Sequence, residues 1–305
     1  MIEYAAPSTT AEALELLRER PAARVVAGGT DLVVAARGKR HPLPDSLIAL
    51  HAIADLAERH EHGADIELGA LTSHEWIEQS PLIRSRWSAL ADASAMIGSP
   101  ATRATGTIGG NLMNASPAMD TGSPLLVLDA TVELQRAGGS RRLTVAELLT
   151  GPGRTSAARD ELLCAVHLPA PAPGTGSAYV RLEHRQAMEI AIVGAAAALR
   201  IGPDGLIGEA RLALTAVAPT CLAVPAAAAL LVGCRPDDES FARAADAAAA
   251  AVQPIDDVRA SAAYRRAMTV VVLVRALTRA AERAVADIHS STHDHRPLAG
   301  TGRNP

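Results

Sequence analysis

Two loops, each built on a pair of adjacent glycines, are the feature that most constrains this chain. The first reads Ala27-Gly28-Gly29-Thr30-Asp31-Leu32, and the second reads Thr107-Ile108-Gly109-Gly110-Asn111. Each follows an apolar or β-branched approach, so a strand can end there with its amides turned outward, and glycine lets that backbone come close to an anion. A hydrogen bond to a charged acceptor contributes about 1.5–3 kcal/mol, so several converging amides can hold a diphosphate without a lysine. The two loops therefore predict one phosphorylated ligand, gripped from two sides.

One such loop by itself is usually an ordinary turn, so this prediction rests on the two together. The common phosphate motifs are missing, because the sequence contains no G-x-x-x-x-G-K-[ST] and neither loop spells G-x-G-x-x-G. The Gly-x-Ser-x-Gly elbow of serine hydrolases is missing too. A P-loop protein, a Rossmann protein and a serine hydrolase are therefore disfavoured.

Composition excludes several classes of partner. With 305 residues, 49% of them hydrophobic, the chain is long enough for two or three globular domains. A net charge of −4 and a pI near 6.2 leave no basic footprint for nucleic acid or for an anionic membrane. The sequence shows no secretory leader and no apolar span, so a cytoplasmic location is expected.

The cysteines and histidines offer no metal site. Cys164, Cys221 and Cys234 are too few and too widely spaced for an iron–sulfur cluster, so they are expected to be reduced core thiols. His60-Glu61-His62, placed in a loop, and His293-Asp294-His295 each lack a third ligand in a defined fold. Because aromatic residues make up only 2% of the chain, aliphatic side chains would have to cover any planar cofactor.

Proline and glycine divide the chain in two. The run from Pro169 to Gly176 supports neither helix nor sheet, so a domain boundary is predicted there. Before it, helices and strands alternate in two α+β subdomains, about 1–55 and 56–176. Capping boxes are expected at Thr9 and Thr144, and a long helix from about Arg84 to Met96.

The part after the boundary, 177–288, is predicted to be a second α+β domain. Three stretches, 178–182, 190–201 and 210–217, have the pattern of antiparallel strands. Two alanine-rich helices, roughly 239–252 and 257–288, are expected to back this three-stranded sheet. The remaining residues, 289–305, are polar and are expected to form a disordered tail.

The sequence around both glycine loops resembles a known family. Ile97-Gly98-Ser99-Pro100-Ala101-Thr102-Arg103, followed by the stretch from Gly106 to Thr121, is similar to the FAD-binding medium subunit of molybdenum hydroxylases, the group of xanthine dehydrogenase and carbon monoxide dehydrogenase. The stretch from Val26 to Leu32 matches the family's other cofactor loop, and the resemblance covers roughly residues 1–285. It implies a two-subdomain FAD-binding domain of the vanillyl-alcohol-oxidase (PCMH) type over 1–176, then the C-terminal domain of the carbon monoxide dehydrogenase flavoprotein over 177–288.

The resemblance also implies which residues bind FAD. The glycine loops would supply amides and hydroxyls to the diphosphate and ribityl chain, and Asp120 would bind a polar edge of the cofactor. Ile97, Met113 and Leu163 would cover it, and Arg181 stands where relatives often carry lysine near the pyrimidine end of the flavin. Relatives also often show Arg-Asn-Arg before the second loop, where this chain has Arg103-Ala104-Thr105. The implied set is Val26, Ala27, Gly28, Gly29, Thr30, Asp31, Leu32, Ile97, Gly106, Thr107, Gly109, Gly110, Asn111, Met113, Asn114, Asp120, Leu163 and Arg181.

No nucleophile, metal ligand or acid–base pair can be identified, which is the pattern expected when a flavin carries the chemistry. The resemblance implies an oxidoreductase subunit that transfers electrons. Substrate would be hydroxylated at a molybdopterin cofactor in a large subunit, electrons would pass through the [2Fe–2S] clusters of a small subunit, and FAD would pass them to NAD or another acceptor. Two alternatives stay open: a stand-alone FAD-dependent oxidoreductase, and a non-catalytic scaffold that has lost FAD.

Overall fold

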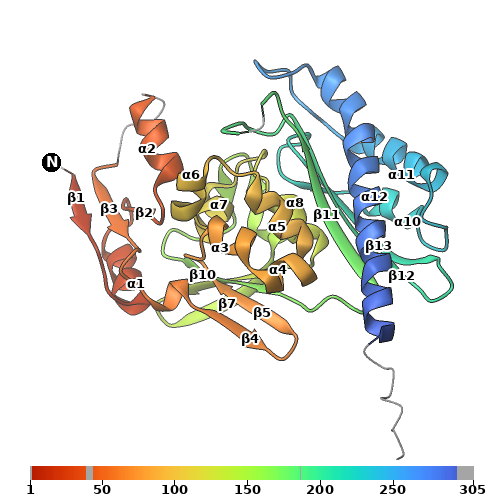
Figure 1. Ribbon diagram of the computed structural model, residues 1–305. Helices are drawn as coiled ribbons and strands as arrows, with labels where there is room; N and C mark the ends of the chain where they lie inside the picture. The colour runs from red at the N-terminus through yellow and green to blue at the C-terminus, as the bar shows by residue number, and fades with distance from the viewer. Residues whose placement is uncertain (1, 39–43, 186, 294–305) are drawn as a thin grey trace, which may run out of the picture.

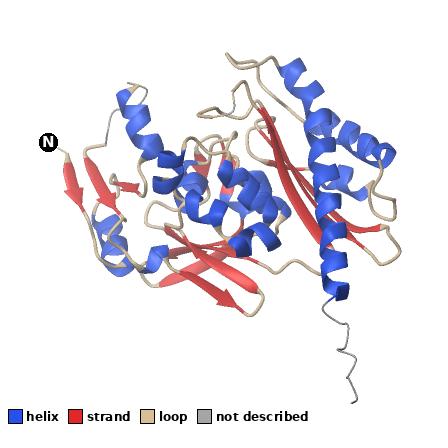
Figure 2. Ribbon diagram, in the orientation of Figure 1, coloured by secondary structure: helices blue, strands red, loops and turns tan. Residues whose placement is uncertain are grey.

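Three parts of the protein follow one another across Figure 1 in the order of the chain, from the red N-terminal subdomain at the left to the blue helix α12 at the right. The structure is a computed structural model and describes residues 2–38, 44–185 and 187–293. Figure 2 shows sheets and helices in each part, which is the α+β organisation expected from the sequence. In the part of the chain that the structure describes, no helix has the length and apolar character needed to cross a membrane.

The first subdomain is a small parallel sheet with two helices. Only half of the capping box predicted at Thr9 forms: Thr9 Oγ1 accepts a hydrogen bond from the Glu12 amide at 3.2 Å, whereas the Glu12 carboxylate accepts from the amide and hydroxyl of Ser8 at 2.8 and 3.0 Å. Leu14 and Leu17 lie one turn apart and pack in one buried cluster with Ile48. The elements are β1 (Glu3–Ala5), α1 (Thr10–Glu19), β2 (Arg24–Val26), α2 (Thr30–Arg37) and β3 (Ser46–Ala49), with strand order β1-β3-β2. The first glycine loop connects the end of β2 to the start of α2.

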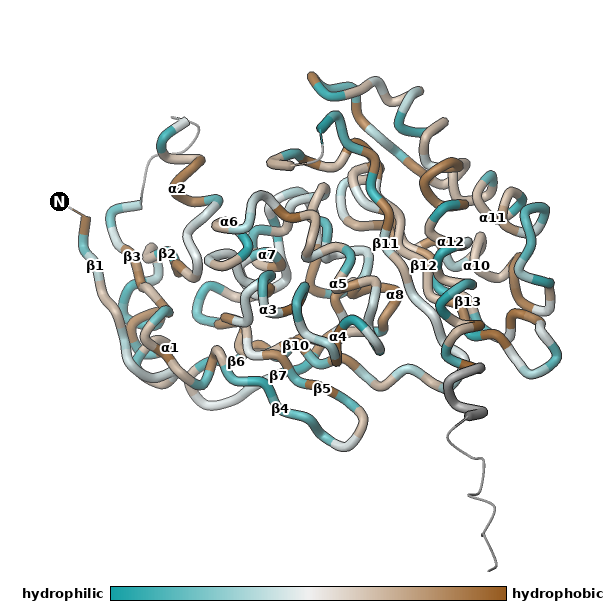
Figure 3. Tube along the Cα trace, viewed as in Figure 1, coloured by the Kyte–Doolittle hydropathy of each residue, from teal (hydrophilic) through white to brown (hydrophobic). Residues whose placement is uncertain are grey.

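The second subdomain is a five-stranded antiparallel sheet in the order β4-β5-β10-β6-β7, packed against helices. Ile66, Leu68 and Val166 on its inner strands are buried against those helices. The edge strand β4 is hydrophilic and teal in Figure 3, and it contains the His60-Glu61-His62 segment that was expected in a loop. The elements are η1 (Asp55–Ala57), β4 (Arg59–His62), β5 (Asp65–Gly69), α3 (His74–Gln79), α4 (Pro81–Arg86), α5 (Ser88–Ala95), α6 (Pro100–Thr105), α7 (Ile108–Asn114), α8 (Gly122–Val127), β6 (Thr131–Arg136), β7 (Gly139–Thr144), α9 (Val145–Leu148), β8 (Leu149–Gly151), β9 (Arg154–Thr155) and β10 (Leu162–Leu168).

The single helix expected from Arg84 to Met96 is wrong, because two helices, α4 and α5, meet at Trp87. The backbone of Trp87 is not helical (φ −121°, ψ 48°), and its side chain is 1% exposed. Its indole N–H donates to the Pro169 carbonyl at 2.8 Å. The free energy gained by burying this ring and bonding its N–H exceeds the cost of interrupting the helix. The periodicity of the sequence does not reveal such a long-range contact.

The C-terminal domain has four strands rather than the predicted three, because β14 adds to the edge of β13. Its first strand begins at Thr175, inside the segment predicted as a linker, and a short helix, α10, was not predicted. The last helix begins later than expected and runs past residue 289, where the tail was predicted to start, whereas residues 294–305 lie outside the described residues. The elements are β11 (Thr175–Leu182), β12 (Val193–Ile201), β13 (Ile207–Thr215), β14 (Leu222–Ala223), α10 (Pro225–Ala229), α11 (Asp238–Ala251) and α12 (Ala262–His293).

The C-terminal sheet is buried on both faces. Alternate residues of β12 belong to two different cores: Ala195 and Ala197 lie in the cluster with α11 and α12, whereas Ala196 and Ala198 lie in that of the second subdomain. Helix α12 also approaches this sheet closely, because a Cβ on Gly176 would overlap the helix backbone, 2.2 Å from the carbonyl oxygen of Ala280. The abundant alanine therefore allows this sheet to be packed between helices (Figure 1). Because the two domains share a core, the boundaries at 1–176 and 177–288 stay predictions.

Candidate cofactor site

The two glycine loops lie against each other. A Cβ on Gly28 would be only 2.0 Å from the carbonyl oxygen of Thr105 and 3.2 Å from the Cα of Gly106. A Cβ on Gly110 would be 3.6 Å from the Cβ of Ala27. Because the nearest atoms to Gly28 belong to the backbone, this approach requires glycine. The structure therefore brings together the two segments that the sequence paired.

The first loop presents an open helix N-terminus. Gly29 adopts a left-handed conformation (φ 69°), and no side chain caps the start of α2 there. The amide of Val33 bonds to the Gly29 carbonyl at 2.9 Å, but the preceding amides of α2 have no partner within the helix. By contrast, side chains of Thr9, Ser73 and Thr107 cap the helices that follow them. The start of α2 is thus suited to an external anion.

The second loop is held by the protein itself. The amide of Ile108 donates to the Thr72 carbonyl at 3.0 Å, and that of Gly109 donates to the Ala70 carbonyl at 2.9 Å. The Gly110 amide donates to the Thr107 hydroxyl at 3.0 Å. These three amides were expected to bind the diphosphate, but each already donates to an oxygen of the protein.

Helix α7 carries two asparagines, the first of them at the end of the second loop. Asn111 accepts a hydrogen bond on Oδ1 from the Thr121 hydroxyl at 2.6 Å, which orients its carboxamide and leaves the NH2 group without a partner among the described residues. Asn114 lies one turn further along α7 and is half-buried. Thr30, at the start of α2, brings its hydroxyl within 3.9 Å of the position of a Cβ on Gly106. The hydroxyl of Thr30 therefore lies near Gly106, just before the second loop.

His74 and Arg103 support the second loop, although sequence reasoning treated them only as a helix start and as part of a motif. His74 is 2% exposed, and its amide donates to the Gly106 carbonyl at 3.1 Å. Burial lowers the pKa of His74 to about 4, helped by the charge of Arg103 and opposed by a hydrogen bond to the Thr107 backbone, so the ring is neutral at physiological pH. Arg103 donates to Glu78 at 2.6 Å and to the Ile97 carbonyl at 3.2 Å.

A buried ionic cluster joins the second subdomain to the C-terminal domain. Asp120, just before α8, accepts hydrogen bonds from the Tyr179 hydroxyl at 2.7 Å and from Arg181 at 2.8 Å, both on β11. Arg181 also pairs with Glu183, and its side chain is fully buried. Burial raises the pKa of Asp120 to about 6, and Arg181 and Tyr179 oppose that effect. The two residues expected to contact the cofactor are therefore engaged with each other across the domain boundary.

The three predicted aliphatic covers differ in exposure. Ile97 and Met113 are half-buried, beside the second loop and within α7 respectively. Leu163 is 2% exposed in the core of the second subdomain, paired across the sheet with Leu134. Leu163 therefore packs with the apolar side chains of this core, and the pairing of β10 with β6 shifts register directly after it, between Leu163 and Ala165.

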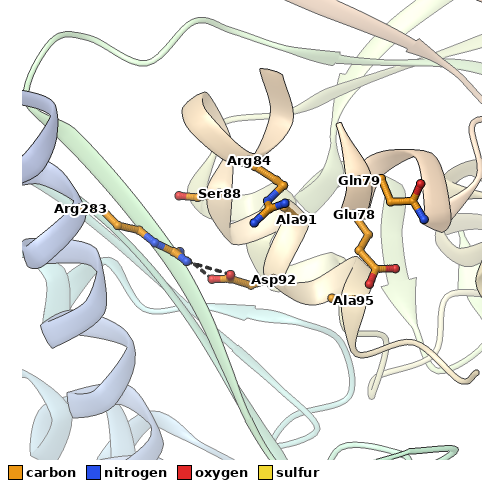
Figure 4. A pocket seen from close by; sticks show the side chains of 8 residues that line it. All are labelled: Glu78, Gln79, Arg84, Ser88, Ala91, Asp92, Ala95 and Arg283. Carbon is orange, nitrogen blue, oxygen red and sulfur yellow. Dashed lines mark hydrogen bonds and ion pairs between the residues drawn. The ribbon is translucent and has the colours of Figure 1, made fainter. Parts of the chain in front are cut away.

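A polar pocket of about 610 Å³ lies elsewhere, between helices α3 to α5 and helix α12 (Figure 4). Asp92 and Arg283 close one side of it, with Nη1–Oδ2 at 2.6 Å and Nη2–Oδ1 at 2.9 Å. The pocket contains none of the predicted cofactor residues. It lies at the boundary between the second subdomain and the C-terminal domain and is separate from the glycine loops.

Comparison with known proteins agrees with this geometry. Residues 1–171 match the FAD-binding domain in molybdopterin dehydrogenase, and residues 178–280 match the CO dehydrogenase flavoprotein C-terminal domain. The carbon monoxide dehydrogenase medium chain of Hydrogenophaga pseudoflava is 32% identical over 279 residues, which are 91% of this chain and 96% of that one. A putative xanthine dehydrogenase FAD-binding subunit of Escherichia coli is 33% identical over 223 residues, covering 71% and 74%.

The same relationship holds in three dimensions. A structure of carbon monoxide dehydrogenase from Hydrogenophaga pseudoflava, lacking the Mo-pyranopterin moiety, superimposes with a TM-score of 0.88 at 32% identity, over 92% of this chain and 98% of that one. The family and fold implied by the resemblance around the two glycine loops are confirmed, and so is FAD as the cofactor. This chain belongs to the family of FAD-binding subunits of molybdopterin dehydrogenases.

Proposed function

We propose that the two glycine loops hold FAD between them, with its diphosphate at the start of α2. Support comes from the open amides there, because the positive end of a helix dipole favours an anion and these amides have no partner within the helix. Thr30, Asn111 and Asn114 bring further donors to the ribityl hydroxyls. Ile97 and Met113 lie beside this region and cover the ring. The residues fit the cofactor because glycine at position 28 lets the two loops approach each other, with the uncapped start of α2 directly after the first loop.

We further propose that the chain is an electron-transfer subunit of a molybdenum hydroxylase. FAD, when bound, supplies the chemistry by taking up and releasing electrons. The chain's own residues bind and orient it, while the buried Asp120–Arg181–Glu183 cluster keeps the C-terminal domain fixed against the cofactor domain. The proposed partners are a small [2Fe–2S] subunit and a large molybdopterin subunit, with NAD or another acceptor receiving the electrons. Support is that similar proteins are named as medium chains or as a complex subunit. A cytoplasmic location stays a prediction.

The visible spectrum of the purified chain tests this proposal. The chain, expressed together with its chromosomal neighbours, is expected to show flavin absorbance, to release FAD on denaturation, and to co-purify with iron- and molybdenum-containing subunits. A flavin-containing chain that reduces an acceptor alone, without metal-containing partners, would support a stand-alone oxidoreductase instead. A colourless chain with no extractable flavin would contradict the whole proposal.

A further inference from the structure

The loop before α12 presents large apolar side chains to solvent. Val258 is 99% exposed and Ile255 is 69% exposed. Tyr264, in the first turn of α12, is 46% exposed. Figure 3 shows brown stretches in this loop at the top of the view. Single exposed apolar residues are normal, but several gathered at one end of a protein mark an interaction surface.

The backbone of this loop is rigidly held. Asp257 Oδ1 accepts hydrogen bonds from the amides of Arg259 at 2.8 Å and Ala260 at 3.1 Å, and from Arg265 at 2.7 Å. Burial acts to raise the pKa of Asp257, but these hydrogen bonds outweigh it and lower the pKa to about 2, so the carboxylate stays charged. Val258 sits inside this turn. Binding of a partner at Val258 therefore costs little conformational entropy, because the loop is already ordered.

Arg265 fastens the same loop to the C-terminal sheet. Its side chain is 3% exposed, and it donates to the carbonyl of Ile192 at 2.6 Å and to that of Ala216 at 3.1 Å. Ile192 precedes β12 and Ala216 follows β13, so the loop is tied to one end of that sheet. Its exposed valine is a fixed feature of the surface.

A second exposed segment lies beside this loop and reaches the cofactor domain. Met188 and Ile190, between β11 and β12, are 57% and 45% exposed. His184 Nε2 lies 2.9 Å from the carbonyl oxygen of Arg259, which joins the two segments. The amide of Met188 donates to the Gly98 carbonyl at 3.2 Å, next to Ile97. The exposed residues Met188, Ile190, Ile255, Val258 and Tyr264 are called the apolar end.

We propose that the apolar end is the docking surface for the small [2Fe–2S] subunit that exchanges electrons with FAD, and that Val258, its most exposed side chain, lies in the contact. This inference rests on the proposed function. Electron exchange requires the partner to approach the cofactor, and the apolar end is hydrogen-bonded to the loop that carries Ile97. Two arginines at its rim are already paired within the chain, Arg185 with Glu189 at 3.3 Å and Arg259 with Asp257 at 3.4 Å, which favours a partner chosen by apolar contact.

The test compares two exposed valines of the C-terminal domain, one within the apolar end and one outside it. Val258→Asp places a charge at the centre of the apolar end, and Val232→Asp places one at a valine that is 51% exposed in the turn between α10 and α11. Ile255→Lys is a second variant of the same surface. Each is expressed with the complete set of subunits, and the assembly is measured by native mass spectrometry and flavin content.

We expect Val258→Asp and Ile255→Lys to keep full FAD and to weaken binding of the partner subunit at least tenfold, which corresponds to about 1.4 kcal/mol. Val232→Asp should assemble like the unmodified chain. Normal assembly of Val258→Asp, or equal loss in Val232→Asp, overturns the docking surface while leaving the proposed function intact. If Val258→Asp leaves the other subunits bound and only dissociates a dimer of this chain, the apolar end binds a second copy of the chain and the proposal is wrong. An unmodified chain that lacks FAD or metal-containing partners overturns both.

Discussion

Gly28→Ala is expected to lower the affinity for FAD at least tenfold and to leave the C-terminal domain folded. The added Cβ would lie 2.0 Å from the Thr105 carbonyl oxygen, which no real contact allows, and the obstacle is backbone rather than a movable side chain. The two loops would have to separate, and α2 would carry its open amides away from Asn111. Affinity is measured by titrating the flavin-free chain with FAD.

Gly139→Ala is the matched control for this variant. A Cβ there meets no atom within 4 Å, and Gly139 lies in the edge strand β7, where alanine is tolerated. It should bind FAD like the unmodified chain. If Gly28→Ala also binds FAD normally, the close approach of the loops does not matter for the cofactor. If both variants lose FAD, the effect comes from general instability.

Local signals in the sequence pointed to the two loops that the structure brings together. The glycine pairs mark the two loops because a close backbone approach demands glycine wherever it occurs. The Thr144–Glu147 capping box forms with both of its hydrogen bonds, since these depend only on residues three apart. The first three strands of the C-terminal sheet were recognisable for the same reason, because apolar runs between turn residues are a local pattern.

Long-range contacts explain what the sequence did not predict. The amides of Ile108 and Gly109 donate to the carbonyls of Thr72 and Ala70. The sequence of the second loop does not predict these partners, because they lie more than thirty residues earlier in the chain. Asp120 and Arg181 were assigned separately to the cofactor, yet they bind each other across the domain boundary. Such pairing depends on how β11 packs against the second subdomain, which no local pattern encodes.

Arg181→Met is expected to destabilise the protein by about 3–5 kcal/mol, because it leaves Asp120 and Glu183 buried without their cation. Arg181→Lys keeps the charge and should recover part of this loss, although lysine cannot reproduce the fork of bonds to two carboxylates. The matched control is Arg200→Met on β12, whose partly exposed pair with Glu209 is worth at most about 1 kcal/mol. Unfolding in urea, followed by circular dichroism, measures all three variants.

The loss in Arg181→Met should depend on pH in a defined direction. The pKa of Asp120 in the folded protein is about 6, above its ordinary value of 3.8, so the folded state holds this proton more tightly than the unfolded state. The stabilisation that comes from protonated Asp120 is fully present below about pH 4 and is lost as the pH rises to about 6.

Removing Arg181 raises the pKa of Asp120 in the folded protein further, so the variant keeps losing stability above pH 6 while the unmodified protein does not. The gap between the two should therefore widen from pH 6 to pH 8 and narrow on acidification. A gap that is constant with pH would show that the lost packing of Arg181, not its charge, causes the effect.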